Sequence, residues 1–332
     1  MVGAAPAETW LDDAPIRIVT TSRRILFLDA SRGLAVIAML LANLVNVCLH
    51  DIPDPLAHNQ GDVLRAFDFP APVFQLLLGV SLALFLAQRR RSGRSELAAR
   101  LDASRRFALL VLLGMVLDAV GKLSLAPRWG VLQTLGLGGL AATALAGTSR
   151  VVRAAIALAL LALYSGFANG VVHARPDAAL AFVPLTLVGV LVGELIAAGW
   201  PADAVGAVAV RIAIVAGTLG AGLALAGVPF NKVLGTSSFV AVATAIAMVV
   251  LAAAARWEAR GGAFPPWLLL VGRNALTAWV LLHVIVYYPA WIVFPGWDRL
   301  TLAPGLLSVV GTTTALCAAT VALGRRGIRV PI

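Results

Sequence analysis

Charged residues are scarce in this chain of 332 residues. Asp, Glu, Lys and Arg make up 13% of it, whereas soluble domains carry about 25%. Hydrophobic residues make up 60%, and the mean hydropathy is +0.92. The shortage of charge excludes an ordinary soluble domain. Because a spanning helix needs about 20 mostly apolar residues, the chain is predicted to be an all-α, polytopic membrane helix bundle of about 10 spans.

Cysteine is also scarce, with only Cys48 and Cys317 in the chain. A disulfide framework needs more cysteines, so both are interpreted as small core residues. No HExxH motif or other metal-ligand spacing occurs, and no bound metal is expected. The first 22 residues have no apolar run long enough for a cleavable signal, which predicts a cytoplasmic tail.

The apolar runs predict a tail over residues 1–22, a transmembrane domain over 23–324 and a second cytoplasmic tail over 325–332. The long cytoplasmic loop 89–106 is expected to contain a short helix. The predicted spans cover residues 25–48, 66–88, 107–121, 130–147, 154–171, 182–200, 211–228, 237–255, 267–287 and 305–323.

Positive charge is distributed unevenly along these loops. With the N-terminus inside, 18 Lys and Arg residues fall on the cytoplasmic side, 6 on the other side and 2 within spans. The positive-inside rule then places both termini in the cytoplasm. The net charge of +10 is thus explained by topology, and no nucleic-acid partner is expected.

The first predicted span carries a polar stripe. At 100° per residue, Asp29, Arg32, Asn43 and Asn46 fall within about 100° of one another on the helix surface. Charges facing lipid are costly, so the stripe is expected to face the bundle interior or an aqueous cavity. Asp29 and Arg32 are spaced i, i+3 and can pair. A buried ion pair and the wall of a site are both open interpretations.

The first outer loop contains two histidines, His50 and His58, with Asp68 further along. Neutral imidazole is a natural general base near neutral pH. Pro70 and Pro72 interrupt the start of the second span. A broken helix at membrane depth is tolerated where it is buried or lines a cavity.

Two other intramembrane polar residues, Arg273 and His283, require an explanation. Arg273 needs a partner, for which Asp29 and Glu194 are candidates. His283 lies in the outer half of the ninth span and is either a core residue with a local hydrogen bond or part of a channel.

Five phrases resemble, in order, those of the heparan-α-glucosaminide N-acetyltransferase family and its bacterial relatives. They are "LDASRGLAVIAMLLANLVN", "FPAPVFQLLLGVSLAL", "RWGVLQTLGLG", "FNKVLGTSSFV" and "VGRNALTAWVLLH". The chain departs from the family pattern where Thr134 follows Gln133, at Ala66 and at Gly235.

The resemblance implies an enzyme of the bacterial plasma (inner) membrane that moves an acetyl group from cytoplasmic acetyl-CoA to an amino or hydroxyl group of an extracytoplasmic sugar or glycan. It implies a catalytic base in the first outer loop, with His58 the better match and His50 the reserve. Asn43 is a candidate oxyanion donor. The residues expected to bind the donor are Arg32, Arg105, Arg106, Gln133 and Asn274. Those expected to line the substrate channel are Asp29, Asn46, Asp68, Asn231, Lys232, Ser238 and His283.

Two other functions stay open from the sequence. Buried charges also suit a transporter, although no internal repeat or pair of broken helices is visible. A non-catalytic relative that binds lipid or a partner is the second. Membrane lipids are expected around the bundle, and a homodimer is left open.

Overall fold

The computed structural model describes residues 24–57, 61–125, 129–166, 171–172, 174–294 and 299–330. Within these ranges the regular structure is helical, apart from one isolated bridge between Leu49 and Leu300. The α-helices are α1 (Leu26–Cys48), α2 (Pro70–Arg91), α3 (Glu96–Lys122), α4 (Val131–Ala144), α5 (Arg150–Gly166), α6 (Pro176–Ala179), α7 (Val183–Ala197), α8 (Ala202–Leu225), α9 (Ser237–Ala259), α10 (Pro266–Arg273), α11 (Ala275–Leu281) and α12 (Leu302–Arg325).

Short helices of other types lie beside these. Three are 3-10 turns, η1 (Asp54–Leu56), η2 (Ala66–Asp68) and η3 (Leu180–Phe182). Two are π-helical, η4 (Leu282–Tyr287) and η5 (Pro289–Val293), and they continue α11. The interruption predicted at the second span is the start of α2, because Pro70 occupies its first position, where a proline costs no hydrogen bond.

The all-α membrane bundle is confirmed. Each predicted span coincides with a helical segment, and seven segments within the described residues are long and apolar enough to cross a membrane. The helices α3, α4 and α5 fall outside these seven, since α3 carries more charge and the other two are shorter. Ten spans with both termini inside stays a prediction.

The short helix expected within the cytoplasmic loop 89–106 is present as the first turns of α3, and the non-helical part of the loop is shorter than predicted. Helix α2 continues to Arg91, and α3 begins at Glu96, where Ser95 accepts a hydrogen bond from the Ala98 N–H at 3.3 Å. The two charged helix ends are joined by an ion pair of 2.5 Å between Arg90 and Glu96. The hydrogen bond from Arg90 lowers the pKa of the Glu96 carboxyl. The charges of this stretch therefore extend two helices instead of forming a loop.

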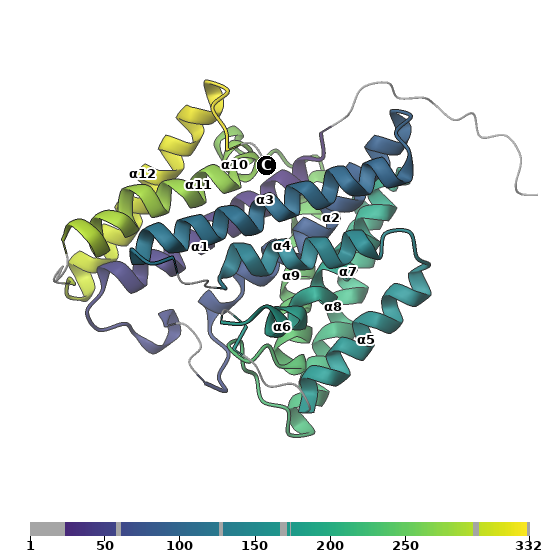
Figure 1. The fold of residues 1–332 in the computed structure, drawn as a ribbon, viewed down its shortest axis with the longest axis horizontal. Helices are drawn as coiled ribbons and strands as arrows, with labels where there is room; N and C mark the ends of the chain where they lie inside the picture. Colours follow the sequence, from purple (N-terminus) through teal and green to yellow (C-terminus); the bar gives the residue numbers. More distant parts are fainter. Residues whose placement is uncertain are drawn as a thin grey trace, which may run out of the picture.

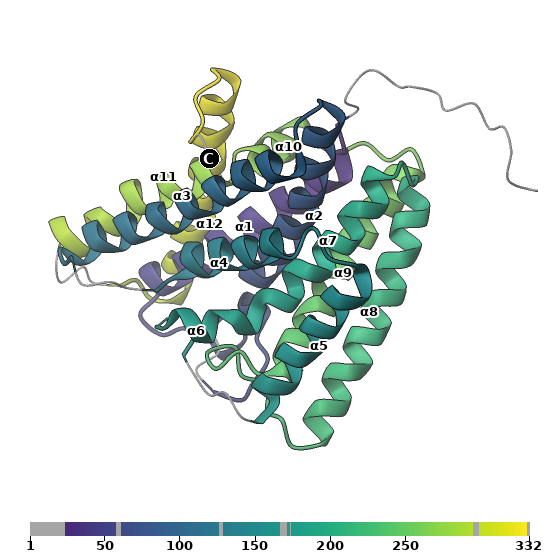
Figure 2. The same ribbon diagram turned by 45° about the vertical axis from the view of Figure 1, so that its right-hand side comes forward.

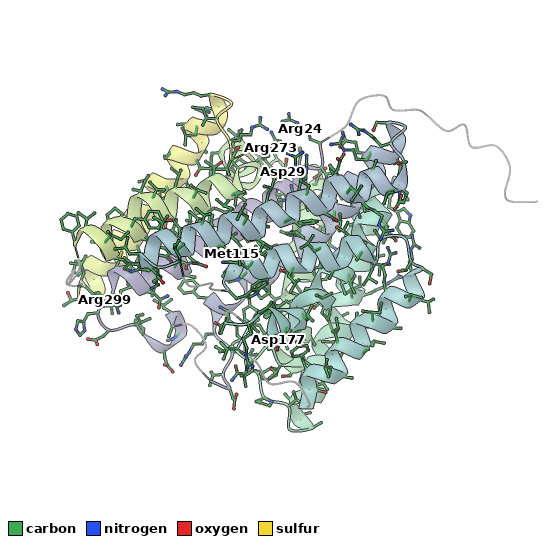
Figure 3. The ribbon with its side chains drawn as sticks, viewed as in Figure 1. Arg24, Asp29, Met115, Asp177, Arg273 and Arg299 are labelled. Atoms are coloured by element: carbon green, nitrogen blue, oxygen red, sulfur yellow. The ribbon has the colours of Figure 1, made fainter. Side chains whose placement is uncertain are left out.

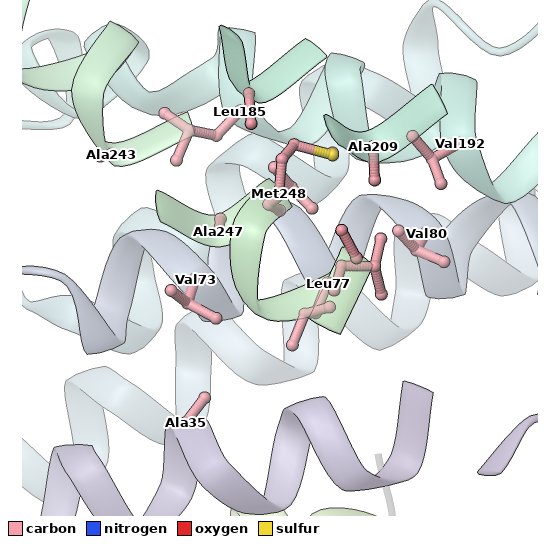
Figure 4. Close-up of a cluster of buried hydrophobic side chains, with 14 of the residues drawn as sticks. Ala35, Val73, Leu77, Val80, Leu185, Val192, Ala209, Ala243, Ala247 and Met248 are labelled. Carbon is pink, nitrogen blue, oxygen red and sulfur yellow. The ribbon is translucent and has the colours of Figure 1, made fainter. Parts of the chain in front are cut away.

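Two groups of helices meet at α2 (Figures 1 and 2). One core lies among α2, α5, α7, α8 and α9, and Leu77, Val80 and Met248 are fully buried in it (Figure 4). A second core joins α1 to α3, α4, α11 and α12. Helices α2 and α7 approach closely at Gly79 and Gly189, which have no side chain to keep the backbones apart. A methyl group on either glycine would lie about 2 Å from a backbone oxygen of the other helix.

Candidate functional site

Two glycines bring α1 and α10 into direct contact. A methyl group on Gly272 would lie 1.9 Å from the backbone oxygen of Asp29, and one on Gly33 would lie 2.4 Å from that of Leu268. Small residues let helix backbones approach this closely. The contact places Arg273, the neighbour of Gly272, beside the charged end of α1.

Asp29 joins two arginines at this contact. Its Oδ2 accepts a hydrogen bond of 2.7 Å from Nε of Arg273, and its Oδ1 lies 3.4 Å from Nη1 of Arg32. Arg32 also donates to the hydroxyl of Ser81 on α2. Asp29 is therefore confirmed as the partner of Arg273, whereas Glu194 binds two arginines at the start of α5.

A cavity of about 580 Å³, which we call the vestibule, lies at this end of α1. Asn274 also lines it, and its Oδ1 is buried without a hydrogen-bond partner among the described residues. The vestibule has a cationic surplus and a free acceptor, which suit an anionic ligand that also carries N–H groups. Figure 3 shows Arg24, Asp29 and Arg273 gathered on one side of the molecule. The charged lining residues are Arg24, Arg32, Arg273, Arg329 and Asp29.

A second cavity, of about 350 Å³, continues from the vestibule, and we call it the slot. The two cavities share Arg32, Ser81, Phe85 and Arg273. Beyond these shared residues, Arg106 adds a further charged side chain to the described lining of the slot. A mostly apolar pocket with a few polar groups at one end is typical of small-molecule sites. The apolar lining includes Met39, Leu78, Leu110, Leu132 and Trp279.

A third void, of about 20 Å³, adjoins the far end of the slot. It shares Val131 and Leu135 with the slot, and Gln75, Thr134 and Lys232 supply its polar side chains. Such a volume holds about one water molecule. The three cavities follow one another from the arginine-rich end of α1 to the loop that precedes α9.

An ion pair closes this path at the predicted outer side. Lys232 Nζ lies 3.3 Å from Oδ1 of Asp68, whose side chain is fully buried. Burial lowers the pKa of Lys232, and the charge of Asp68 opposes this shift. The neighbouring Asn231 donates to Oδ1 of Asp62 at 2.9 Å. The structure thus brings together Asp68, Asn231 and Lys232, which the sequence analysis named as channel residues.

The residues predicted to bind the donor separate into two groups. Arg32, Arg106 and Asn274 line the vestibule or the slot, and the Arg106 guanidinium stacks 4.4 Å above the Phe85 ring. Arg105 is exposed and lines neither of these cavities. Gln133 is buried and donates to Oδ2 of Asp118 at 2.7 Å, also outside them.

The polar stripe of α1 is divided in the same way. Asp29 and Arg32 face the vestibule, but Asn43 and Asn46 are held by their own helix, through bonds to Met39 and Ala42 oxygens of 2.7 Å and 2.9 Å. The amide oxygen of Asn43 also accepts from the Tyr287 hydroxyl at 2.6 Å. Neither asparagine lines the vestibule, the slot or the third void.

The other candidates lie away from the cavities. The side chain of His50 is 72% exposed, 3.2 Å from a carboxylate oxygen of Asp51. His283 is buried, with its Nδ1 2.9 Å from the Trp279 carbonyl oxygen, as the core interpretation expects. The buried Ser238 hydroxyl donates to the Pro229 carbonyl at 2.6 Å. His58 lies outside the described residues.

Sequence reasoning did not single out Arg24, Gln75, Phe85 or Arg329 as site residues. They come from three separate segments: Arg24 precedes α1, Gln75 and Phe85 lie on α2, and Arg329 follows α12. Their shared position depends on helix packing, so no local pattern signals it. Among the described residues, no group of three or more His, Cys, Asp or Glu side chains is arranged to hold a metal ion.

One comparison with known proteins gives a match. The family model described as "Heparan-alpha-glucosaminide N-acetyltransferase, catalytic" matches residues 24–198, from the start of α1 to the end of α7. No curated protein matches the chain. The matched residues include Asp29, Arg32 and Asp68, while Lys232, Arg273 and Arg329 follow them.

Proposed function

Because the chain belongs to the heparan-alpha-glucosaminide N-acetyltransferase catalytic family, we propose that it moves an acetyl group from acetyl-CoA to an amino or hydroxyl group of an extracytoplasmic sugar or glycan. The family and the apolar helices make it a membrane acetyltransferase. The bacterial inner membrane is the proposed location. The observation that carries the proposal is the series of cavities from the vestibule through the slot to Lys232.

The vestibule fits the charged part of CoA. CoA carries several phosphates, and guanidinium groups bind phosphate through charge-assisted hydrogen bonds. Arg24 has no ion pair among the described residues and faces the same cavity as Arg32 and Arg273. The free Oδ1 of Asn274 is an acceptor for an amide or amino N–H of the ligand. These residues would hold the donor at the predicted cytoplasmic side.

The slot fits the narrow part of the donor. Its volume of about 350 Å³ lies within the range of known ligand pockets. Acetyl-CoA supplies an activated thioester, and the slot would direct it towards the third void. Passage to Lys232 requires the void to widen, because it now holds about one water molecule.

The transfer step is proposed to take place beside Lys232. The acceptor nitrogen or oxygen attacks the thioester carbonyl carbon, and His58 takes the proton of the acceptor. The C–S bond then breaks, and the CoA thiolate leaves and is protonated to the thiol. The ammonium of Lys232, held by Asp68, would stabilise the oxyanion that forms in between.

We choose His58 as the base on its place in the sequence, four residues before Asp62. Asp62 in turn accepts a hydrogen bond from Asn231, the neighbour of Lys232. His50, in contrast, follows the bridge that joins Leu49 to Leu300 at the start of α12. This supports His58 as the base.

The test compares the two histidines in purified protein in lipid nanodiscs. CoA release from acetyl-CoA is measured with glucosamine as the acceptor, and CoA binding is measured by calorimetry. We expect His58→Ala to lower the transfer rate by about 10²–10⁴-fold with CoA affinity preserved. His50→Ala is the matched control and keeps the rate. A wild-type protein that neither binds CoA nor releases it from acetyl-CoA would overturn the proposal and favour the transporter.

A further inference from the structure

The chain turns back towards the bundle after α12. Gly327 adopts a positive φ of 75°, and the Ile328 N–H donates to the Leu323 oxygen at 3.0 Å. The next residues return to α11, where the Val330 N–H donates to Oγ1 of Thr277 at 3.2 Å. Figure 1 shows the chain turning back after the end of α12 rather than continuing along the helix axis. We call residues 327–330 the C-terminal strap.

The strap lies where the vestibule and the slot meet. Arg329 lines the vestibule, and Val330 lines the slot. Both cavities also include Arg273, which precedes Thr277 by one helical turn. Thr277 is 5% exposed, so its hydroxyl is a buried anchor for the strap. A ligand that extends from one cavity into the other must pass beside these residues.

No carboxylate among the described residues neutralises the charge of Arg329. Asp29 is the one carboxylate among the side chains that line the described vestibule, and it already binds Arg32 and Arg273. Arg329 has no ion pair among the described residues. A free guanidinium at the edge of a cationic cavity attracts anions, and phosphate is a favoured partner.

We infer that Arg329 is a donor-binding residue and that the C-terminal strap closes over the bound donor. Its guanidinium contacts a phosphate group of CoA, while Val330 and the bond to Thr277 hold the strap across the entrance of the slot. This inference rests on the proposed function, since it takes CoA as the ligand. It gives a binding role to a segment that the sequence analysis interpreted only as a cytoplasmic tail.

The test measures CoA binding to the full chain in nanodiscs by calorimetry and by stopped-flow dissociation. We expect Arg329→Ala to weaken CoA binding about tenfold, as for the loss of one hydrogen bond to a charged group. Arg326→Ala is the matched control, because Arg326 is exposed and lines neither the vestibule nor the slot. Thr277→Val keeps the shape of the side chain and all arginines, and it is expected to speed CoA dissociation.

The outcomes separate the two proposals. Wild-type protein that does not bind CoA overturns the proposed function and this inference together. Binding by the wild type with equal affinities for Arg329→Ala and Arg326→Ala overturns only the role of Arg329. Tighter binding by Arg329→Ala or Thr277→Val means that the strap obstructs the site, which overturns closure over the donor. A lower melting temperature of Arg329→Ala without CoA shows a structural role and also contradicts the inference.

Discussion

The buried ion pair of Lys232 and Asp68 contributes to the stability of the fold and also places a cation at the proposed site. Asp68 is fully buried, and the Lys232 side chain is 13% exposed. Taking two charges out of water is costly, and their attraction offsets this cost only while both are present. Lys232 lies at the end of the cavity series and lines the third void together with Gln75 and Thr134. A fixed cation at this point is useful for stabilising a developing oxyanion.

Removal of one partner is expected to damage the fold. Asp68→Asn leaves the Lys232 ammonium buried without its counter-charge, which costs about 3–5 kcal/mol. Thermal unfolding in nanodiscs measures this cost. Lys122→Met is the control, because Lys122 lies 4.5 Å from the Trp291 ring centre rather than against a carboxylate. A double change of Lys232 to Met and Asp68 to Leu is expected to recover part of the loss.

The titration of Lys232 gives a second prediction at the residue scale. Because burial lowers its pKa in the folded protein from the ordinary 10.5, the unfolded chain binds more protons in the range between the two values. The contribution of Lys232 to the free energy of unfolding therefore rises as pH increases from its lowered pKa towards 10.5. Melting temperatures of the wild type and Lys232→Met across this range test the sign. A pH dependence that is the same in both proteins would contradict it.

At the scale of elements, the contact between α1 and α10 assembles the cationic end of the site. Gly33 and Gly272 let the two backbones touch, and Asp29 then reaches Arg273. Helix α1 is fixed at its start as well, since the Phe27 N–H donates to Oε2 of Glu258 at 2.6 Å. A carboxylate is favourable at a helix N-terminus. Two neighbouring helices therefore hold the register of α1.

An alanine at Gly272 is expected to force α1 and α10 apart. Its methyl group would lie 1.9 Å from the Asp29 oxygen, and overpacking of this kind costs at least about 1–3 kcal/mol. The expected results are a lower melting temperature and weaker CoA binding. Gly222→Ala is the matched control, because a methyl group there has open space and alanine favours a helix by about 1 kcal/mol. Equal effects of both changes would argue against a role for the close contact.

For the whole molecule, the order of the cavities bears on which side of the helix bundle faces the cytoplasm. The proposed function places the vestibule, with the donor, at the predicted cytoplasmic side and Lys232 at the opposite side. The arrangement requires the loop between α2 and α3 to lie inside and the loop after α3 to lie outside. The Lys and Arg distribution predicts the same orientation.

Cysteine labelling in intact cells tests this orientation. With Cys48 and Cys317 replaced by Ala, Leu125→Cys is expected to react with a membrane-impermeant maleimide from outside, since Leu125 is 96% exposed in the loop after α3. Ser95→Cys, in the loop between α2 and α3, is expected to react only after the cells are opened. The reverse pattern would invert the bundle and place the vestibule outside.

The sequence by itself determined the class, the family and the approximate positions of most helices. Apolar runs and low charge are enough for a membrane bundle, because lipid requires the backbone to satisfy its own hydrogen bonds. The i, i+3 pair of Asp29 and Arg32 also follows from helix geometry alone. The sequence predicts a short helix within 89–106 and a separate span over 107–121, whereas one capped helix continues from Glu96 to Lys122, because a helix can extend beyond the apolar layer.

Only the tertiary structure decided which polar residues share a site. Asn43 and Asp29 lie on the same stripe, yet Asn43 bonds to Tyr287 while Asp29 reaches Arg273. The choice depends on which neighbouring helix packs against each turn of α1. The position of Arg329 is decided in the same way, because its place in the vestibule depends on contacts between the chain end and α11. Such contacts join residues far apart in sequence, so helical periodicity carries no information about them.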